Sequence, residues 1–251
     1  MLTRLDHLVV LVGDLDLAVR EYETLGFTVT PGGEHADGLT HNALIPFRDG
    51  SYLELVAFLN PDDPRDNVWG WRPFLSSGRG LIDYCAASDD LGAEVRRLED
   101  LGFEVEGPTD GGRRLPDGTE IRWRTARIRQ DGRAMPFMIE DLTPRSLRVP
   151  DGPPAEHPNG AAGTSRLEVA VPDVSASDLV TLTAGCAGTA LWLGDCELSL
   201  VSPEDDEARR RLDAAGPGPS AVKLATDAPD GAKELDRRRS HGVSISLLRH
   251  D

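Results

Sequence analysis

The sequence predicts an α+β fold built from repeated β-α-β-β-β modules. Two observations predict it. Residues 5–29 (LDHLVVLVGDLDLAVREYETLGFTV) align without a gap to residues 81–105 (LIDYCAASDDLGAEVRRLEDLGFEV), at an offset of 76. Each copy also reads as an apolar strand, an acidic turn, an amphipathic helix, a glycine and a second strand, because the spacing of the apolar residues changes accordingly.

The helix of each copy carries its own start and stop signals. In the first copy Asp14 or Asp16, and in the second copy Asp89 or Asp90, can cap the helix N-terminus and interact favourably with its positive dipole end. A glycine follows each helix, where a residue in the left-handed conformation commonly ends it. The pattern therefore predicts one helix in each copy, directly after the first strand.

Three strands are expected after each helix, and turn residues separate them. In the first copy the strands are FTVTP, THNALIPF and SYLELVAF, and in the second copy FEVEGP, TEIRWRTARIR and MPFMIED. The sequence thus predicts two modules, at about 1–60 and 78–145, that together form a first domain at 1–145.

The rest of the chain repeats this pattern incompletely. A Pro-rich stretch at 146–162 predicts an extended linker. Residues 163–251 then read as a degenerate or truncated module pair. The elements expected there are a strand and a helix in 165–185, a hairpin in 191–203, a charged helix in 203–212, and a strand, a helix and a second strand in 220–247.

Composition limits the classes of partner. The net charge is −16, so nucleic acid and anionic membranes would repel the chain, and neither is an expected partner. Lys223 and Lys233 are the only lysines, which fits either a high-GC genome or an acidic protein of a salt-rich, halophilic cytoplasm. The sequence has no long apolar run, no signal-peptide pattern and three cysteines without metal-type spacing. We therefore expect a cytoplasmic protein.

Several motifs resemble a known family. LDHLVVLVGDL, HNALIPFRDGSYLELVAF, RRLPDGTEIRWR, PFMIED and HPNG are similar to the glyoxalase-like proteins of bacteria and archaea. Paired modules with a strand-borne histidine resemble the vicinal oxygen chelate (VOC) superfamily, which includes glyoxalase I, extradiol dioxygenases and bleomycin-resistance proteins. The resemblance implies curved mixed sheets around a cup, with the helices outside. It specifies the fold more than the reaction, because this superfamily supports several chemistries on one scaffold.

The resemblance also implies a metal site in the cup, with ligands from the first and last strands of each module. Carried over to this chain, these positions hold His7, Glu54, Asp83 and Glu140. One histidine with carboxylates would suit Mn²⁺, Fe²⁺, Ni²⁺, Mg²⁺ or catalytic Zn²⁺. Asp83 departs from the pattern, since the metal enzymes of the superfamily more often have His or Glu there. No organic cofactor is expected.

Strand alternation is consistent with a shared cup. In a strand His7 shares a face with Val9, and Asp83 shares a face with Cys85 and Ala87, so both polar side chains would point the same way. Each residue also has a structural explanation, because a lone histidine in an apolar strand is commonly a hydrogen-bonded core residue. Both explanations stay open on the sequence alone.

Other residues are expected to bind the ligand or to close the cup. Asn42 can donate and accept hydrogen bonds, so it would orient a substrate, unless it is only a strand-end amide. Trp123 and Phe137 would line the cavity or belong to the core. Trp69 and Trp71, in the segment between the modules, would form a lid or bury that segment.

Two classes of function follow from this site. The first is a metal-dependent lyase or isomerase of the glyoxalase type that acts on a small oxygenated metabolite, with Glu140 or Glu54 as the catalytic base. The alternative is a metal-free protein that binds or sequesters a small molecule, as bleomycin-resistance proteins do. A structural or regulatory module with a vestigial pocket is a third reading. Whether the modules pair within one chain or between the chains of a homodimer is left open.

Three histidines receive no role from the sequence. An extradiol dioxygenase is disfavoured, because its iron needs two histidines and only His7 stands at a ligand position. His35 or His41 would change this if their loop folded inward. His157, in the Pro-rich linker, is expected to be solvent-exposed or to reach toward the cup.

Overall fold

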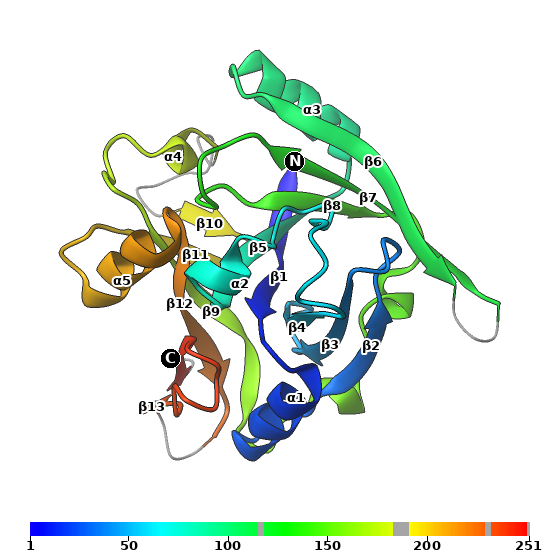
Figure 1. The fold of residues 1–251 in the computed structure, drawn as a ribbon. Helices are drawn as coiled ribbons and strands as arrows, with labels where there is room; N and C mark the ends of the chain where they lie inside the picture. Colours follow the sequence, from blue (N-terminus) through cyan, green and yellow to red (C-terminus); the bar gives the residue numbers. More distant parts are fainter. Residues whose placement is uncertain (115–117, 183–190, 229–231, 250–251) are drawn as a thin grey trace.

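The computed structural model describes residues 1–114, 118–182, 191–228 and 232–249. These residues form an α+β fold with repeated modules, as predicted. Figure 1 shows two curved sheets, with α1, α3, α4 and α5 at the periphery and the short helix α2 near the centre. The two complete modules share an eight-stranded sheet, and the second half of the chain forms a six-stranded sheet.

The two predicted copies share the same order of elements. The first contains β1 (Leu2–Leu11), α1 (Leu15–Thr24), β2 (Thr30–Glu34), β3 (Thr40–Pro46) and β4 (Tyr52–Phe58). After the short helix α2 (Phe74–Ser77), the second contains β5 (Gly80–Ser88), α3 (Leu91–Asp100), β6 (Val105–Arg114), β7 (Glu120–Ile128) and β8 (Phe137–Asp141).

The helix signals of the two copies are confirmed. Asp14 is the N-cap of α1 and accepts a hydrogen bond from the backbone N–H of Leu17. Asp90 caps α3 in the same way. Gly26 and Gly102 follow the helices with φ angles of 88° and 93°, a conformation that side chains with a Cβ disfavour.

The second half keeps only part of the module pattern. Its elements are η1 (Arg145–Leu147), η2 (Pro153–Ala155), β9 (Ala161–Ala170), α4 (Asp178–Leu182), β10 (Leu191–Leu193), β11 (Cys196–Val201), α5 (Asp206–Ala215), β12 (Gly218–Thr226), β13 (Lys233–Glu234) and β14 (Ser244–Arg249). The predicted hairpin is present as β10–β11. The charged helix is present as α5, capped by Asp205.

The helix expected between the last two strands is a wrong prediction for the residues that the structure describes there. Residues 232–243 contain the short strand β13 and a series of turns. The reason is that Leu235 is the only large apolar residue between Lys233 and Ser240, so a helix would have no apolar face to bury. Leu235 instead packs singly into the core.

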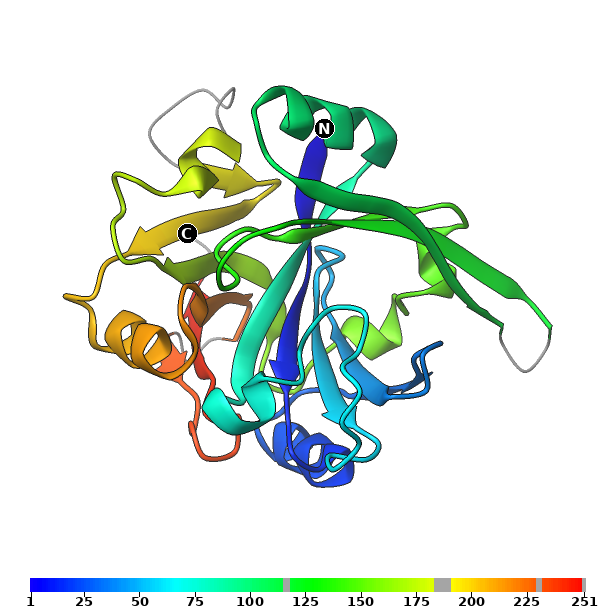
Figure 2. The same cartoon turned by 45° about the horizontal axis from the view of Figure 1, so that its top comes forward.

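The strand order places the cup at the centre of the first sheet. The order is β2-β3-β4-β1-β5-β8-β7-β6, and the two modules meet where β1 and β5 pair in antiparallel register. One edge strand reaches the other, because Arg113 of β6 donates a hydrogen bond to the carbonyl of Gly32 in β2. The sheet therefore curls around a concave face, as the two orientations in Figures 1 and 2 show.

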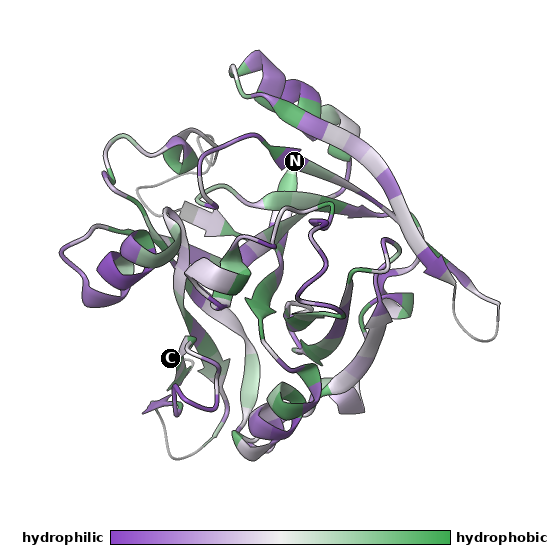
Figure 3. Cartoon of the chain, viewed as in Figure 1, coloured by the Kyte–Doolittle hydropathy of each residue, from purple (hydrophilic) through white to green (hydrophobic). Residues whose placement is uncertain are grey.

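The convex face of the first sheet is covered by the second sheet and by helices. Leu8 and Tyr84 from the centre of the first sheet belong to the same buried cluster as Leu167 of β9 and Val222 of β12. A second cluster, which includes Val9, lies on the concave face. Figure 3 shows that the central strand β1 is hydrophobic while α5 is largely hydrophilic. The core thus fixes the back of the cup.

The Pro-rich stretch packs against the first module, so the expectation of a solvent-exposed histidine is wrong. His157 is only 8% exposed. Its Nδ1 accepts a hydrogen bond from the N–H of Thr28 (2.9 Å), and its Nε2 donates to the carbonyl of Pro46 (2.8 Å). These two backbone bonds place His157 in the scaffold, away from the cup.

Among the described residues, no helix combines the length and the hydrophobicity that are needed to cross a bilayer.

Candidate active site

His7 owes its position to an irregularity in β1. The register between β1 and β5 shifts between Leu5 and His7, so Asp6 is an extra residue in the strand. Leu5 and Leu8 both lie in the core between the sheets. Alternation is broken between them, and the side chains of Asp6 and His7 meet: Nδ1 of His7 lies 2.7 Å from Oδ1 of Asp6.

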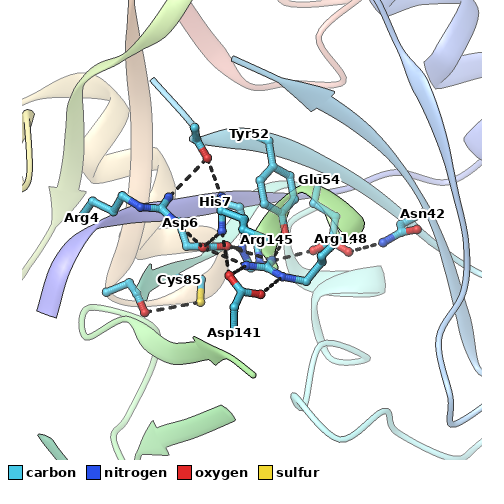
Figure 4. A network of polar contacts seen from close by, with 12 residues as sticks. Arg4, Asp6, His7, Asn42, Tyr52, Glu54, Cys85, Asp141, Arg145 and Arg148 are labelled. Atoms are coloured by element: carbon cyan, nitrogen blue, oxygen red, sulfur yellow. Dashed lines mark hydrogen bonds and ion pairs between the residues drawn. The ribbon is translucent and has the colours of Figure 1, made fainter. Parts of the chain in front are cut away.

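Asp6 is the centre of a buried ionic network, drawn in Figure 4. Both of its oxygens accept hydrogen bonds from Arg148 (3.1 and 3.0 Å), and Arg145 contacts one of them. Burial alone would raise the pKa of Asp6, but Arg148 and His7 hold that pKa well below its usual range. Since the carboxylate can only accept, Nδ1 of His7 carries the hydrogen, and Nε2 is left facing Glu54.

Glu54 of β4 brings two histidines together. Its Oε2 lies 3.4 Å from Nε2 of His7, and its Oε1 lies 3.2 Å from Nε2 of His35. The carboxylate is 5% exposed, and burial alone would raise its pKa. Hydrogen bonds and charge from His35, His7 and Asn42 instead lower the pKa of Glu54 to about 2. Glu54 is therefore an anion at neutral pH.

The sequence left open whether the loop with His35 and His41 folds toward the cup. In the structure this loop, between β2 and β3, folds inward and places His35 in the cup. Nδ1 of His35 lies 2.6 Å from the hydroxyl of Thr40, and its backbone N–H donates to the carbonyl of Thr40. These contacts leave Nε2 pointing at Glu54. His41 precedes Asn42 on β3, so alternation turns its side chain away from the cup.

Asn42 is held over Glu54 by a glycine. The amide nitrogen of Asn42 donates to Oε1 of Glu54, and its oxygen accepts from the N–H of Gly33 (3.0 Å). A Cβ on Gly32 would lie 1.9 Å from that oxygen, so any other residue at this position would displace the amide. The Pro-Gly-Gly segment of β2 thereby sets the orientation of Asn42.

Asp83, an expected ligand, lies behind the wall of the cup. One of its oxygens accepts a hydrogen bond from the indole N–H of Trp71 (2.9 Å), and Arg133 lies 3.6 Å away. Burial raises the pKa of Asp83, and Arg133 offsets this only in part. Trp71 lines the cavity while Asp83 is 1% exposed and does not. The pairing of β1 with β5 shifts register directly after Val9, the residue that pairs with Asp83.

Glu140, the fourth expected ligand and one of the two expected bases, faces away from the cup. Oε2 of Glu140 accepts from Arg124 (2.6 Å) and from the N–H of Leu91, the first residue of α3. The neighbouring residues of β8, Phe137 and Ile139, line the cavity, so alternation directs Glu140 to the other face. The predicted quartet is therefore brought together only in its first half, by His7 and Glu54.

The strand register explains why the second half of the quartet is missing. Val9 pairs with Glu54 in the first module, and Cys85, which corresponds to Val9 at the offset of 76, pairs with Phe137. Phe137 is thus the structural counterpart of Glu54. Similar motifs had suggested Glu140 for this role, but the sequence alone does not reveal the register.

Five aromatic side chains, Tyr52, Trp69, Trp71, Trp123 and Phe137, line one part of the cavity, which has a volume of about 330 Å³. Tyr52 stacks on His7 with the ring centroids 4.6 Å apart, and Phe137 meets the same imidazole edge-on. Trp69 and Trp71 stack on each other at 4.8 Å. Both tryptophans line the cavity together with Trp123, Phe137 and Asn42. Such a wall suits a small organic ligand.

A second group of metal-competent atoms lies beneath the cavity, in Asp6, His7 and Cys85, all within 4.8 Å of one another. It does not fit a metal well. Both oxygens of Asp6 are already bonded to Arg148. Burial raises the pKa of the Cys85 thiol well above its usual value, which disfavours the thiolate that a metal needs. This group is better described as part of the ionic network.

The model of the glyoxalase-like domain family matches residues 5–183. The chain belongs to this family. Its fold is that of the VOC superfamily, with paired modules around a cup. A search of curated proteins finds no match for this glyoxalase-like chain.

Solved structures share the fold at low sequence identity. A hypothetical protein from Staphylococcus aureus is 14% identical, with a TM-score of 0.71 over 98% of this chain and 99% of the other. A xylose isomerase-like TIM barrel/4-hydroxyphenylpyruvate dioxygenase fusion protein is 16% identical, with a TM-score of 0.52 over 92% of this chain and 37% of the other. A methylmalonyl-CoA epimerase from Streptomyces coelicolor is 22% identical, with a TM-score of 0.44 over 57% of this chain and 100% of the other.

Proposed function

We propose that this glyoxalase-like chain is a metal-dependent lyase or isomerase that acts on a small oxygenated metabolite in the cup. One observation carries the proposal: Nε2 of His7 and Nε2 of His35 each face a different oxygen of the buried Glu54, at 3.4 and 3.2 Å. All three residues line the same cavity. His35 takes the place of the ligands that Asp83 and Glu140 do not provide.

These three side chains are of ligand types that a divalent cation takes, although their nearest ligand atoms do not all lie within 4.8 Å of one another in the structure. Two imidazoles and one carboxylate are common ligands of Mn²⁺, Fe²⁺, Ni²⁺ and Zn²⁺. Atoms that share a cation at about 2.1 Å lie roughly 3 Å apart, as each N···O pair does. A cation would have to draw the three ligand atoms closer together and displace the Asn42 amide nitrogen, which contacts Oε1 of Glu54 and Nε2 of His35. Asp6 and Thr40 anchor the other ring nitrogens of His7 and His35, and such anchoring is usual for metal-binding histidines.

A bound metal would supply Lewis-acid stabilisation of negative charge that develops on a substrate oxygen. A cation would keep Glu54 ionised and would occupy its oxygens, so Glu54 suits the role of ligand rather than that of base. Asp37 suits the role of base better. Its Oδ1 is fixed by the N–H of Leu39, while its Oδ2 is buried without a hydrogen-bond partner, and the residue lines the cavity.

Exchange of a carbon-bound hydrogen tests the proposed reaction class without knowledge of the substrate. We would incubate the protein with a panel of 2-oxo and 2-hydroxy acids and aldehydes in D₂O and follow the α-proton signals by NMR. We expect catalysed exchange for at least one compound, and its loss in Asp37→Asn with the metal retained. Asp62→Asn, in an exposed loop outside the cavity, is the matched control. Absence of exchange across the panel would count against a lyase or isomerase.

The second candidate is a metal-free binding protein, and the positions of Asp83 and Glu140 favour it. Asp83 accepts a hydrogen bond from Trp71, and Glu140 accepts one from Arg124. Neither carboxylate is therefore free to bind a metal, as a metal-dependent enzyme with the expected four ligands would require. Native mass spectrometry separates the candidates. A chain that carries an organic molecule and no metal in any preparation would support sequestration and contradict the enzyme.

A further inference from the structure

We propose that the cup selects a planar monocarboxylic acid and that Arg113 binds the carboxylate. This inference names the substrate class of the proposed site and rests on that proposal for the reaction. It starts from the arginines that line the cavity, namely Arg113, Arg127 and Arg148. Their charges are compensated to different degrees.

Two of the three arginines already have carboxylate partners. Arg148 is bonded to Asp6 and Asp141, and Nε of Arg127 lies 2.6 Å from an oxygen of Glu106. Among the residues that the structure describes, Arg113 has no carboxylate within ion-pair distance. Its charge is therefore the one in the cavity wall that is available to a ligand.

The guanidinium of Arg113 is held in place with donor capacity to spare. Its two terminal nitrogens form long hydrogen bonds to the carbonyls of Gly32 (3.4 Å) and Arg148 (3.3 Å). Its Nε is buried and has no hydrogen-bond partner. A planar guanidinium with unused donors is the group that best matches the two oxygens of a carboxylate, because it can bind both at once.

The wall beside Arg113 is flat and aromatic. Gly111 lies two residues before Arg113 on β6, hence on the same face, and it pairs with Trp123 of β7. A Cβ on Gly111 would lie 2.4 Å from the indole nitrogen of Trp123, so the glycine lets this ring lie across the strand. The stacked pair of Trp69 and Trp71 provides a second aromatic surface in the same cavity. A planar acid would contact these rings through its body.

The rim of the cavity limits the charge of the ligand. Glu34 and Asp110 line the cavity and are exposed. They would repel a ligand with several negative charges, such as a phosphate ester. A cavity of about 330 Å³ also favours a compact molecule. One carboxylate on a small planar body satisfies both conditions.

A matched pair of probes tests the inference. We would measure the binding of benzoylformate and of its uncharged amide by isothermal titration calorimetry. We expect the acid to bind at least about tenfold more tightly than the amide to the wild-type protein, because a charge-assisted bidentate contact is lost in the amide. Arg113→Met should remove this preference, and Arg113→Lys should reduce it, since lysine keeps the charge without the planar fork.

Arg122→Met is the matched control, because Arg122 lies on the same hairpin, is exposed and faces away from Trp123. It should keep the full preference for the acid. Equal binding of acid and amide, no binding of either, or an acid preference that survives in folded Arg113→Met would overturn the inference. If Arg113→Met does not fold, an undiminished preference in Arg113→Lys would overturn it instead.

Metal content in the same samples separates this inference from the proposed function. An Arg113-dependent acid preference in a metal-free protein would leave the carboxylate site standing and remove the metal-dependent reaction. A metal-loaded protein whose ligand preference ignores Arg113 would do the opposite.

Discussion

Asp6 is the residue on which the geometry of His7 depends. It binds Nδ1 of His7 on one side and Arg148 on the other, while its own side chain is fully buried. A buried charge is strongly stabilised only while its partners are present, so the network links the ligand geometry to the stability of the fold. Asp6 and His7 are neighbours in the sequence, but strict alternation in a strand would place their side chains on opposite faces. Their contact is therefore not predictable from the sequence.

Removing the charge of Asp6 should therefore be costly. We expect Asp6→Asn to lower the free energy of unfolding by about 3–5 kcal/mol, because Arg148 would be left as a buried cation with one carboxylate fewer. Urea denaturation followed by circular dichroism measures this change. Asp62→Asn, at an exposed loop position, is the control and should change it by less than about 0.5 kcal/mol. A similar small change for Asp6→Asn would show that the network does not hold the site.

His157 should make stability depend on pH. It accepts a backbone hydrogen bond at Nδ1, so only the neutral ring fits, and burial lowers its pKa below the unfolded value of 6.5. The unfolded chain then binds more protons below about pH 6.5. The stabilisation is complete above that pH and is lost as the pH falls toward and through the lowered folded-state pKa.

Comparison with His157→Gln isolates this contribution, since glutamine can donate and accept but does not titrate. The difference in the free energy of unfolding between wild type and variant should shrink between about pH 7 and pH 5. A difference that stays constant over this interval would contradict a neutral, buried His157.

At the scale of elements, β1 and β5 show what strand periodicity can and cannot predict. Alternation placed Val9 on the face of His7, and Val9 lies in the cluster on the concave face. It did not show that Leu8 and Val10, on the opposite face, pack between the two sheets. It failed at Asp6, where the register with β5 shifts. A shift of one residue reverses the direction of a side chain, and sequence patterns do not encode it reliably.

The loop between β2 and β3 escaped prediction for a different reason. His35 lies in a loop without periodicity, so the sequence does not predict where its side chain points. Its orientation depends on contacts with Thr40, which no motif singles out, and with Glu54, which is distant in the sequence. The glycines of the Pro-Gly-Gly segment were the available signal. Consecutive glycines in a strand indicate that another chain segment approaches closely, as Asn42 does here.

Substitution of Gly32 tests the packing of this element. We expect Gly32→Ala to displace the Asn42 amide and to weaken ligand or metal binding by about tenfold or more, since a Cβ there would overlap the amide oxygen. Gly92→Ala, in α3, meets no atom closer than 3.5 Å and should be neutral or slightly stabilising. Equal, negligible effects of the two substitutions on binding would indicate that Asn42 has no part in the site.

At the scale of the whole molecule, the internal repeat predicted the fold because two copies of one module must bury equivalent faces. It did not predict that the second sheet would cover the back of β1 and β5. Leu167 of β9 and Val222 of β12 share a core with Leu8 and Tyr84. The two halves, which composition separates at the Pro-rich stretch, are therefore one packed unit.

A shared core predicts cooperative unfolding. Calorimetry of the full chain should give one transition, with the van't Hoff enthalpy equal to the calorimetric enthalpy, because the halves cannot separate without exposing the cluster around Leu8. Two resolved transitions would mean that the halves are independent domains.

The orientations of Glu140 and Asp83 also depend on the whole molecule. Only the assembled sheet fixes the strand register that directs these two side chains away from the cup.

The central claim is that His7, His35 and Glu54 hold a divalent metal, and metal analysis of protein purified without chelators tests it most directly. We predict about one divalent metal per chain, which is lost in His35→Ala and in Glu54→Ala. The metal should be retained in His41→Ala, because the side chain of His41 faces away from the cup. Circular dichroism would confirm that each variant is folded. A folded wild-type protein without metal, or a metal content that is the same in His35→Ala as in His41→Ala, would contradict the claim.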